Sequence, residues 1–266
     1  MAVYIKDLSY GRFGNKLFFY NNLRQLAHFL NTNYGCDPFP GTEIFDGPFC
    51  QSPAPERGQY YTVIFKEIAA LGREEGKKRL KELGLQYDLI LSVILADMFY
   101  WLDDMNTREI FKVKNPPDLG PGKHVALHFR GTDYFSWDPR AILPVDFYFK
   151  GIREIKNVLP DAVFHLFTDD HRLDSYRQVT AFLRGENLSY VFGNIANPYE
   201  DFKAMTECDA IISAPSSYST TAGFIGKEKL IVQSAQWINY KIEEKDPFWI
   251  GLINGGNKNY HLWKAL

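Results

Sequence analysis

The alternation of apolar and polar segments in the second half of the chain predicts a repeating strand–helix pattern. Short apolar runs predict strands, and segments with apolar residues at helical spacing predict helices. The predicted strands cover residues 125–128, 162–167, 190–192, 210–213 and 230–233. The predicted helices cover residues 144–159, 173–184 and 199–206, and a further helix starts over 219–226. This alternation indicates βαβ units around a parallel sheet, and therefore an α/β fold.

The first half of the chain has a less regular pattern. Residues 3–8 predict a strand, and the helix that follows ends over 31–35. Apolar residues recur at helical spacing along this helix, at Leu17, Tyr20, Leu23, Ala27 and Leu30. The remaining predictions are a long loop over 36–60 with a short strand near 43–45, and helices over 66–83 and 107–113. The apolar stretch 87–102 is compatible with a strand leading into a helix or with one buried helix.

A break in regular structure is predicted between the two halves. Residues 114–122 contain three prolines and two glycines, which interrupt any helix or strand. The length of 266 residues allows one large domain or two smaller ones. We therefore predict an N-terminal domain over 1–115 and a C-terminal domain over 123–266, whose last helix can return to pack on the first domain.

Composition and charge narrow the range of functions. The net charge is −2 and the basic residues are scattered, which argues against nucleic acid as a partner. Three cysteines without a Cys-x-x-Cys pair predict neither a disulfide framework nor a zinc site. The N-terminus lacks the pattern of a signal peptide, and no apolar window is long enough for a membrane span. These features predict a soluble, cytoplasmic or otherwise intracellular protein.

Polar residues follow three of the predicted strands in the C-terminal half. His128 and Arg130 follow the first, Thr168–Asp170 follows the second, and Ser213–Ser219 follows a later one. In a parallel sheet these strand ends lie at one edge, where α/β proteins bind ligands. Arg130 is suited to grip a phosphate through its planar fork of donors. An ion pair that only fixes the structure, between Arg130 and Asp133, is the alternative interpretation.

Four motifs, which occur along this chain in the same order as in the family, resemble those of GDP-fucose-dependent fucosyltransferases of the α-1,2 type. They are also related to motifs of the protein O-fucosyltransferases. His128–Tyr134 resembles their H-x-R-x-G-D-Y motif, and Phe167–Asp170 resembles their F-S-D-D segment. Asp201–Asp209, followed by Ser216–Ser219, is similar to their D-x-x-x-M-x-x-C-D with its downstream serines. Gly11–Asn15 is similar to the Gly-rich turn near their start.

The resemblance implies a GT-B fold, in which two Rossmann-like domains face each other across a cleft. It implies that the second domain holds GDP-fucose, that Arg130 clamps the β-phosphate, and that no metal or other cofactor is required. Asp169 or Asp170 is then a candidate for guanine, and His128 packs beside the nucleotide or orients Arg130. The implied donor-binding residues are Gly11, Arg12, Phe13, Gly14, His128, Asp169, Asp170, Ser216, Ser217, Ser219 and Thr220.

The implied reaction is an inverting transfer of fucose to a hydroxyl of a glycan acceptor. Arg130 would stabilise the charge that builds on the departing diphosphate, and Asn15 would reach the sugar or acceptor from the first domain. Asp133 is the first candidate for the base that deprotonates the acceptor. Two alternatives stay open: the departing phosphate takes the proton, or Asp133 only fixes Arg130.

Two other classes of function compete with this interpretation. A metal-dependent phosphohydrolase could use carboxylates and imidazoles as ligands, at His128, Asp133, His165, Asp169, Asp170 and His171. Arg130 among them would repel a cation. A non-catalytic protein that binds nucleotide sugars or glycans is the second alternative. The sequence leaves the acceptor, the role of residues 36–105 and the oligomeric state open.

Overall fold

The structure, a computed structural model, describes residues 1–6, 8, 12–38, 40–47, 59–92, 111–137, 139–225, 229–234 and 260–263. These residues divide into two compact units, and the division in sequence falls between Phe111 and Lys112. The Pro- and Gly-rich segment 114–122 therefore lies at the start of the second unit. Gly11, most of the predicted helix 107–113, residues 93–102 of the apolar stretch and most of the region expected to hold a last helix lie outside the described residues.

The first unit contains a four-stranded parallel sheet in the order β2-β1-β4-β3. Its strands are β1 (Ala2–Ile5), β2 (Asn33–Cys36), β3 (Tyr60–Val63) and β4 (Asp88–Leu91). Its helices are α1 (Phe13–Phe29), α2 (Phe65–Ala70) and α3 (Arg73–Gln86), with a 3-10 turn over Pro40–Glu43. The predicted first strand and first helix are confirmed as β1 and α1.

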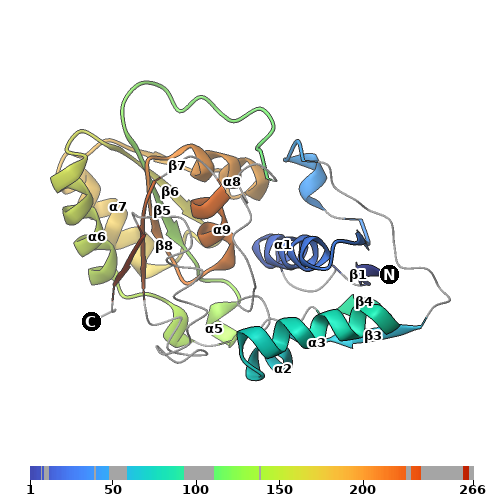
Figure 1. Cartoon of the computed structure of the whole chain (residues 1–266). Coiled ribbons are helices and arrows are strands. Elements are labelled where there is room, and N and C mark those ends of the chain that lie inside the picture. The colour runs from blue at the N-terminus through green and yellow to red at the C-terminus, as the bar shows by residue number, and fades with distance from the viewer. Residues whose placement is uncertain are drawn as a thin grey trace. The chain divides into compact units, whose positions relative to one another are not determined.

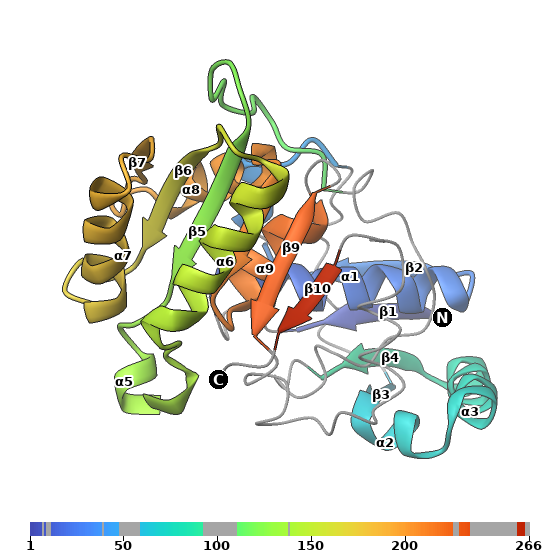
Figure 2. The ribbon, with the colours of Figure 1, turned by 90° about the vertical axis from the view of Figure 1, so that its left-hand side faces the viewer.

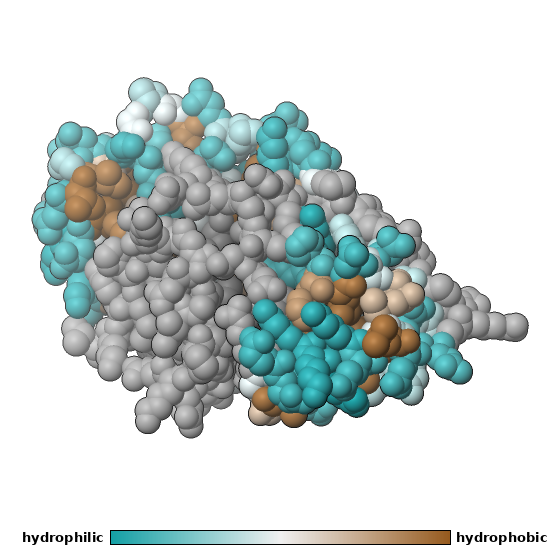
Figure 3. All heavy atoms as spheres, in the orientation of Figure 1, coloured by the Kyte–Doolittle hydropathy of each residue, from teal (hydrophilic) through white to brown (hydrophobic). Residues whose placement is uncertain are grey.

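Three predictions in this unit are wrong in detail. The single helix expected over 66–83 is two helices, because Gly72 between them has a positive φ of 80° that continues neither helix. A 3-10 turn, Pro40–Glu43, precedes the position where a strand was expected near 43–45. Residues 33–36 form strand β2 rather than the end of a helix, because they pair in parallel with β1. The densely charged helix α3 presents a hydrophilic surface (Figure 3).

The second unit contains a six-stranded parallel sheet in the order β10-β9-β8-β5-β6-β7. Its strands are β5 (His124–Phe129), β6 (Val163–Thr168), β7 (Tyr190–Phe192), β8 (Ala210–Ser213), β9 (Leu230–Ser234) and β10 (Tyr260–Trp263). Its helices are α5 (Tyr134–Trp137), α6 (Val145–Val158), α7 (Asp174–Gly185), α8 (Pro198–Glu207) and α9 (Ser217–Ile225), with a 3-10 turn over Pro139–Ala141. The predicted strand–helix alternation is confirmed here, within a few residues at each boundary.

Helices cover both faces of this second sheet (Figures 1 and 2). Helices α6 and α7 pack on one face, and α8 and α9 pack on the other. Strand β5 is buried at every position, as expected for a central parallel strand covered on both faces. The inward side of α6 carries Phe147, Ile152 and Ile155, all buried, as its helical spacing predicted.

The strand order of the second sheet reverses direction at its centre. Strand β5 is followed in sequence by β6 and β7 on one side, and the chain then crosses to β8, β9 and β10 on the other. Such a reversal leaves a crevice beyond the carboxyl ends of the two central strands, here β5 and β8. The two parallel-sheet units confirm the predicted α/β class. Among the described residues, no helix has the length and apolarity needed to cross a bilayer.

Candidate functional site

The residues after β5 and β8 meet at the reversal point of the second sheet. The Ala214 amide donates a hydrogen bond of 3.1 Å to the carbonyl oxygen of His128, which ties the two strand ends together. The Tyr134 hydroxyl donates to the carbonyl oxygen of Pro215. The convergence of polar clusters expected from the sequence therefore exists at this edge, between the loop after β5 and the start of α9.

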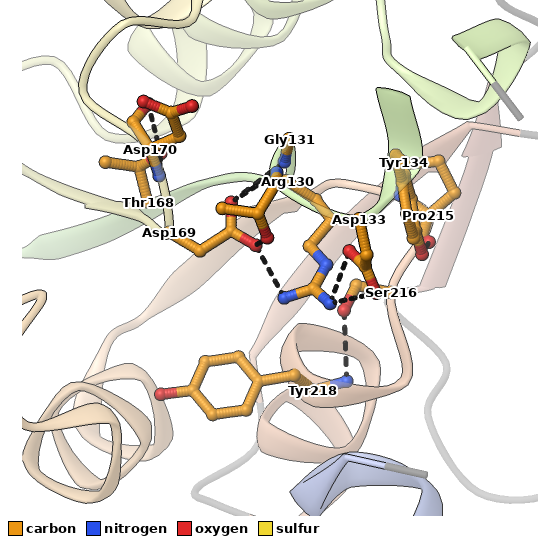
Figure 4. Close-up of polar contacts among 11 residues, drawn as sticks. Arg130, Gly131, Asp133, Tyr134, Thr168, Asp169, Asp170, Pro215, Ser216 and Tyr218 are labelled. Carbon is orange, nitrogen blue, oxygen red and sulfur yellow. Dashed lines mark hydrogen bonds and ion pairs between the residues drawn. The ribbon is translucent and has the colours of Figure 1, made fainter. Parts of the chain in front are cut away.

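Arg130 lies at the centre of this group, with its guanidinium between two carboxylates (Figure 4). Its NH2 group donates to Asp133 at 2.8 Å, and its NH1 group pairs with Asp169 at 2.7 Å. The side chain is 10% exposed, and its guanidinium carbon lies 5.4 Å from the centre of the Tyr134 ring. The arginine is thus desolvated and held in one orientation, as a preorganised anion ligand must be.

Asp169 fixes both Arg130 and the turn that follows it. Its carboxylate accepts hydrogen bonds from the Gly131 amide at 2.8 Å and from the Thr132 hydroxyl at 2.7 Å. Burial acts to raise its pKa, but the charge of Arg130 and the hydrogen bonds from Thr132 and Gly131 outweigh burial, so the pKa lies below its ordinary value. The carboxylate is therefore ionised at neutral pH and is engaged in positioning.

Gly131 lies in a closely packed part of the loop after β5. Its backbone does not use the conformational freedom of glycine, since the glycines with positive φ among the described residues are Gly72, Gly120 and Gly122. A Cβ atom at position 131 would instead meet the side chain of Leu173 at 2.6 Å. A side chain here would force the buried Leu173 side chain, at the start of α7, to move.

His128 is a buried, neutral imidazole beside Arg130. Burial, followed by the nearby charge of Arg130, lowers its pKa to about 3. Its ring centre lies 5.5 Å from that of Tyr218, and its carbonyl oxygen accepts a 3.0 Å hydrogen bond from the Tyr148 hydroxyl. This placement is compatible with packing against a ligand and with orienting the end of β5.

The serines and threonine predicted to bind the donor divide into two groups. Ser219 shares a 2.7 Å hydrogen bond with Ser213, and Thr220 donates to Gln233 at 3.4 Å, so both hydroxyls are engaged inside the unit. Ser216 and Ser217 lie where α9 begins, and the Ser216 hydroxyl accepts from the Tyr218 amide at 3.3 Å. The start of α9 at Ser216 and Ser217, rather than the Ser219 and Thr220 hydroxyls further along its first turn, is therefore the candidate anion site.

Asp170 is paired differently from its neighbour Asp169. Both of its oxygens accept hydrogen bonds from Arg172, at 2.9 Å each, and one also accepts from the Arg172 amide at 2.8 Å. The hydrogen bonds from Arg172 lower the pKa of Asp170. Because Arg172 is exposed, this pair lies at the rim of the site.

The residues of the competing metal-site interpretation are not assembled. His165 hydrogen-bonds His124 at 2.9 Å, while Asp169 and Asp170 bind arginines. No group of three or more His, Cys, Asp or Glu side chains that could hold a metal occurs among the residues that the structure describes. The carboxylates proposed as ligands are thus arranged around cations of the chain itself.

The buried histidines predict a loss of stability in mild acid. Burial and the charge of Arg130 lower the His128 pKa to about 3, and burial and His124 lower that of His165 to about 4, from 6.5. The unfolded chain binds these protons first, so stability is full above about pH 6.5 and falls by about 1.4 kcal/mol per pH unit for each imidazole as the pH drops toward 4. Urea unfolding at pH 7, 5.5 and 4.5 measures this. His165→Gln should show a shallower fall, and equal stability at all three pH values would contradict the assignment.

The site residues predicted in the first unit lie at the start of α1. Arg12 precedes the helix, and its carbonyl oxygen accepts from the Asn15 amide at 3.0 Å. The ring of Phe13 stacks on that of Phe45 with centres 6.3 Å apart, and Gly14 is buried. The participation of Arg12, Phe13, Gly14 and Asn15 in one site with Arg130 stays a prediction.

Sequence reasoning missed several residues that build the site. Thr132 binds Asp169, Tyr134 ties the β5 loop to Pro215, and Tyr218 packs on His128. Tyr134 and Tyr218 both lay inside quoted motifs, but nothing in the spacing showed which side chains they would contact. These contacts depend on which strands are neighbours, and that is a property of the sheet order.

Comparison with known proteins finds a likeness in sequence over part of the chain and a likeness in fold over most of it. No protein-family model matches it. A 138-residue segment is 30% identical to the O-antigen biosynthesis glycosyltransferase WbnK of Escherichia coli. The match includes 48% of this chain and 44% of that protein, so the chain corresponds to less than half the length of this relative.

Solved structures of fucosyltransferases share the fold over most of the chain. The fucosyltransferase NodZ from Bradyrhizobium has a TM-score of 0.54 at 13% identity, with 85% of this chain and 92% of NodZ covered. POFUT1 in complex with GDP has a TM-score of 0.54 at 11% identity, with 87% and 98% covered. A FUT1 variant of Arabidopsis thaliana in complex with GDP has a TM-score of 0.55 at 9% identity, with 86% and 70% covered. The resemblance predicted from the motifs is thereby confirmed for the fold, and the chain is an α/β protein with the GT-B-type fold of these fucosyltransferases.

Proposed function

We propose that this protein is a metal-independent, inverting glycosyltransferase that moves fucose from GDP-fucose to a hydroxyl of a glycan. The observation that carries the proposal is the desolvated Arg130, held at the reversal point of the second sheet next to the start of α9. Support comes from fold neighbours solved with GDP-fucose, NodZ and POFUT1, and from the partial likeness to an O-antigen glycosyltransferase.

In this proposal the diphosphate of the donor binds between Arg130 and the first turn of α9. The amides at the start of a helix carry partial positive charge, and Ser216 and Ser217 add hydroxyl groups there. Negative charge grows on the β-phosphate as the bond to the sugar breaks. Arg130 and the helix start therefore bind the transition state more tightly than the bound donor.

In the proposed chemical step, the bond from the acceptor oxygen to the anomeric carbon forms and the bond from that carbon to the diphosphate breaks. The acceptor oxygen attacks the anomeric carbon from the side opposite the diphosphate, its proton passes to Asp133, and the electrons of the breaking bond remain on the β-phosphate. Asp133 suits this role because its side chain is 44% exposed although it is hydrogen-bonded to Arg130. The first domain, 1–115, would supply the acceptor side, including Asn15, and the second, 123–266, would hold the donor.

Asp169 acts in this proposal as a positioning residue for Arg130. We expect Asp169→Asn to lower kcat/KM about 10- to 100-fold, because a charge-assisted hydrogen bond contributes about 1.5–3 kcal/mol. Steady-state kinetics with GDP-fucose measures the effect. Asp209→Asn is the matched control, since Asp209 also binds an amide and a cation of the chain, at His124 and Lys123, but at the amino end of β5. Equal losses in the two variants would contradict a role specific to Arg130.

Calorimetric titration tests the proposed function directly. The protein, treated with EDTA, is titrated with GDP and with UDP as the control. GDP binding without added metal, clearly tighter than that of UDP, is the expected result, followed by release of fucose from GDP-fucose. GDP binding without release or transfer of fucose would favour the non-catalytic binding protein. Binding that requires a divalent ion would overturn metal-independent donor binding.

A further inference from the structure

A short aromatic segment emerges directly from the candidate site. Helix α5, Tyr134–Trp137, begins immediately after Asp133, and three of its four residues are aromatic. Tyr134 is buried, whereas Phe135 is 56% exposed and Trp137 is 43% exposed. An exposed indole that follows directly on a polar site is a candidate for ligand contact, because it offers a large apolar ring with one polar group.

Contacts within the second unit fix the rings of Tyr134 and Trp137 relative to Arg130. The Tyr134 ring lies under the Arg130 guanidinium at 5.4 Å, and the Trp137 ring packs on the Tyr134 ring with centres 5.2 Å apart. The Tyr134 hydroxyl is anchored on Pro215. The indole is therefore one ring removed from the arginine that the proposed reaction uses.

The backbone links the same segment to the proposed base. The Trp137 amide donates to the carbonyl oxygen of Asp133 at 2.8 Å, and the Ser136 hydroxyl donates to the same oxygen at 3.0 Å. The position of Asp133 and that of the indole are thus set by one turn. A molecule that rests on Trp137 would be held close to the carboxylate of Asp133.

We propose that the exposed indole of Trp137 forms a stacking platform for a pyranose ring of the acceptor, adjacent to Arg130 and Asp133. This inference rests on the proposed function and extends it to the acceptor. One face of a pyranose carries mainly C–H groups, which pack on an exposed aromatic ring, while the hydroxyl groups at its edge remain free to react. Ligand sites combine apolar and aromatic walls with a few polar groups. Here the segment after Asp133 supplies the aromatic wall, and Arg130 and Asp133 supply the polar groups.

A second exposed aromatic position in the same unit provides a comparison. Phe192, at the end of the edge strand β7, is 51% exposed and contacts the rings of Tyr176 and Tyr190. The exposed fraction of its side chain is similar to that of Trp137. Its described ring contacts are with Tyr176 and Tyr190, and not with Tyr134. Substitution at Phe192 therefore controls for the removal of an exposed ring as such.

Saturation-transfer NMR tests the platform. The protein is mixed with a pool of methyl glycosides of galactose, glucose, mannose, fucose, N-acetylglucosamine and N-acetylgalactosamine, with and without GDP. Its aromatic protons are irradiated. We expect transfer to the ring protons of at least one glycoside in wild type, at least tenfold weaker binding of it in Trp137→Ala, partial rescue in Trp137→Phe, and wild-type binding in Phe192→Ala.

Two results would overturn the platform. One is that no glycoside of the pool receives saturation from the wild-type protein, and the other is that Trp137→Ala binds as wild type does. Thermal unfolding of the same samples shows whether each variant is folded, and calorimetric titration with GDP separates the two proposals. Glycoside binding that depends on Trp137, in a protein that binds no GDP, would leave the platform standing and contradict the proposed function.

Discussion

Replacing Arg130 with alanine is expected to lower kcat/KM for GDP-fucose by about 10²–10³-fold, the loss typical of one oxyanion donor. Arg130 is 10% exposed and its guanidinium is held by Asp133 and Asp169, so no water-exposed side chain can take its place without reorganisation. GDP affinity should fall as well, because the arginine also binds the diphosphate of the product. Steady-state kinetics and calorimetric titration with GDP measure the two effects.

Two further variants show whether the loss of activity in Arg130→Ala comes from the missing guanidinium at this site. Arg130→Lys retains the charge but not the planar fork, so it should recover only part of the activity. Arg153→Ala removes a guanidinium of α6 that lies over the Phe182 ring of α7, away from the site, and should behave as wild type. Wild-type GDP affinity in a folded Arg130→Ala protein would show that the diphosphate binds elsewhere.

Asp133→Asn is expected to lower kcat by about 10²–10⁴-fold while GDP affinity is kept or increased. The amide cannot accept the acceptor's proton, which explains the loss of rate. The variant also removes a negative charge that binds Arg130 at 2.8 Å and that would repel a diphosphate. Single-turnover kinetics with GDP-fucose, alongside GDP titration, separates the chemical step from binding.

The opposite pattern would assign Asp133 a different role. If Asp133→Asn retains nearly full kcat, the departing phosphate takes the proton and Asp133 serves to hold Arg130. If both kcat and GDP affinity fall together, Asp133 acts on the position of the arginine. Asp133→Glu is the control, since it keeps a carboxylate and moves it by one methylene group.

Most elements of the second unit follow closely from the sequence, although α5 and β10 were not predicted. Buried parallel strands read as short apolar runs, and a helix on a sheet shows its buried side at helical spacing, as α6 does through Phe147, Ile152 and Ile155. In the first unit the same reasoning found β1 and α1 but missed β2 and β3. Asn33–Cys36 has little strand character of its own, and its pairing with β1 determines its conformation.

The sequence predicted where the candidate site lies in the fold, but it predicted the role of each residue less well. Polar residues after β5, β6 and β8 were expected to converge because parallel strands end at one edge. The sequence offered Asp169 and Asp170 as equivalent candidates for guanine, yet Asp169 binds Arg130 and the loop after it, while Asp170 binds Arg172. The two neighbouring carboxylates thus have different partners, and the local sequence pattern does not show which arginine each of them binds.

The sequence by itself determined the α/β class, the alternation of strands and helices from β5 to β9 in the second unit, and the likeness of the motif around Arg130 to fucosyltransferases. These features depend on local periodicity and on residue types, which a single chain displays directly. Tertiary structure decided the sheet order, the pairing of Arg130 with both Asp133 and Asp169, the packing of Leu173 against Gly131, and the exposure of Trp137 beside Tyr134. Each of these joins residues from separate elements or depends on what packs around them, so it exists only once the strands have taken their places in the sheet.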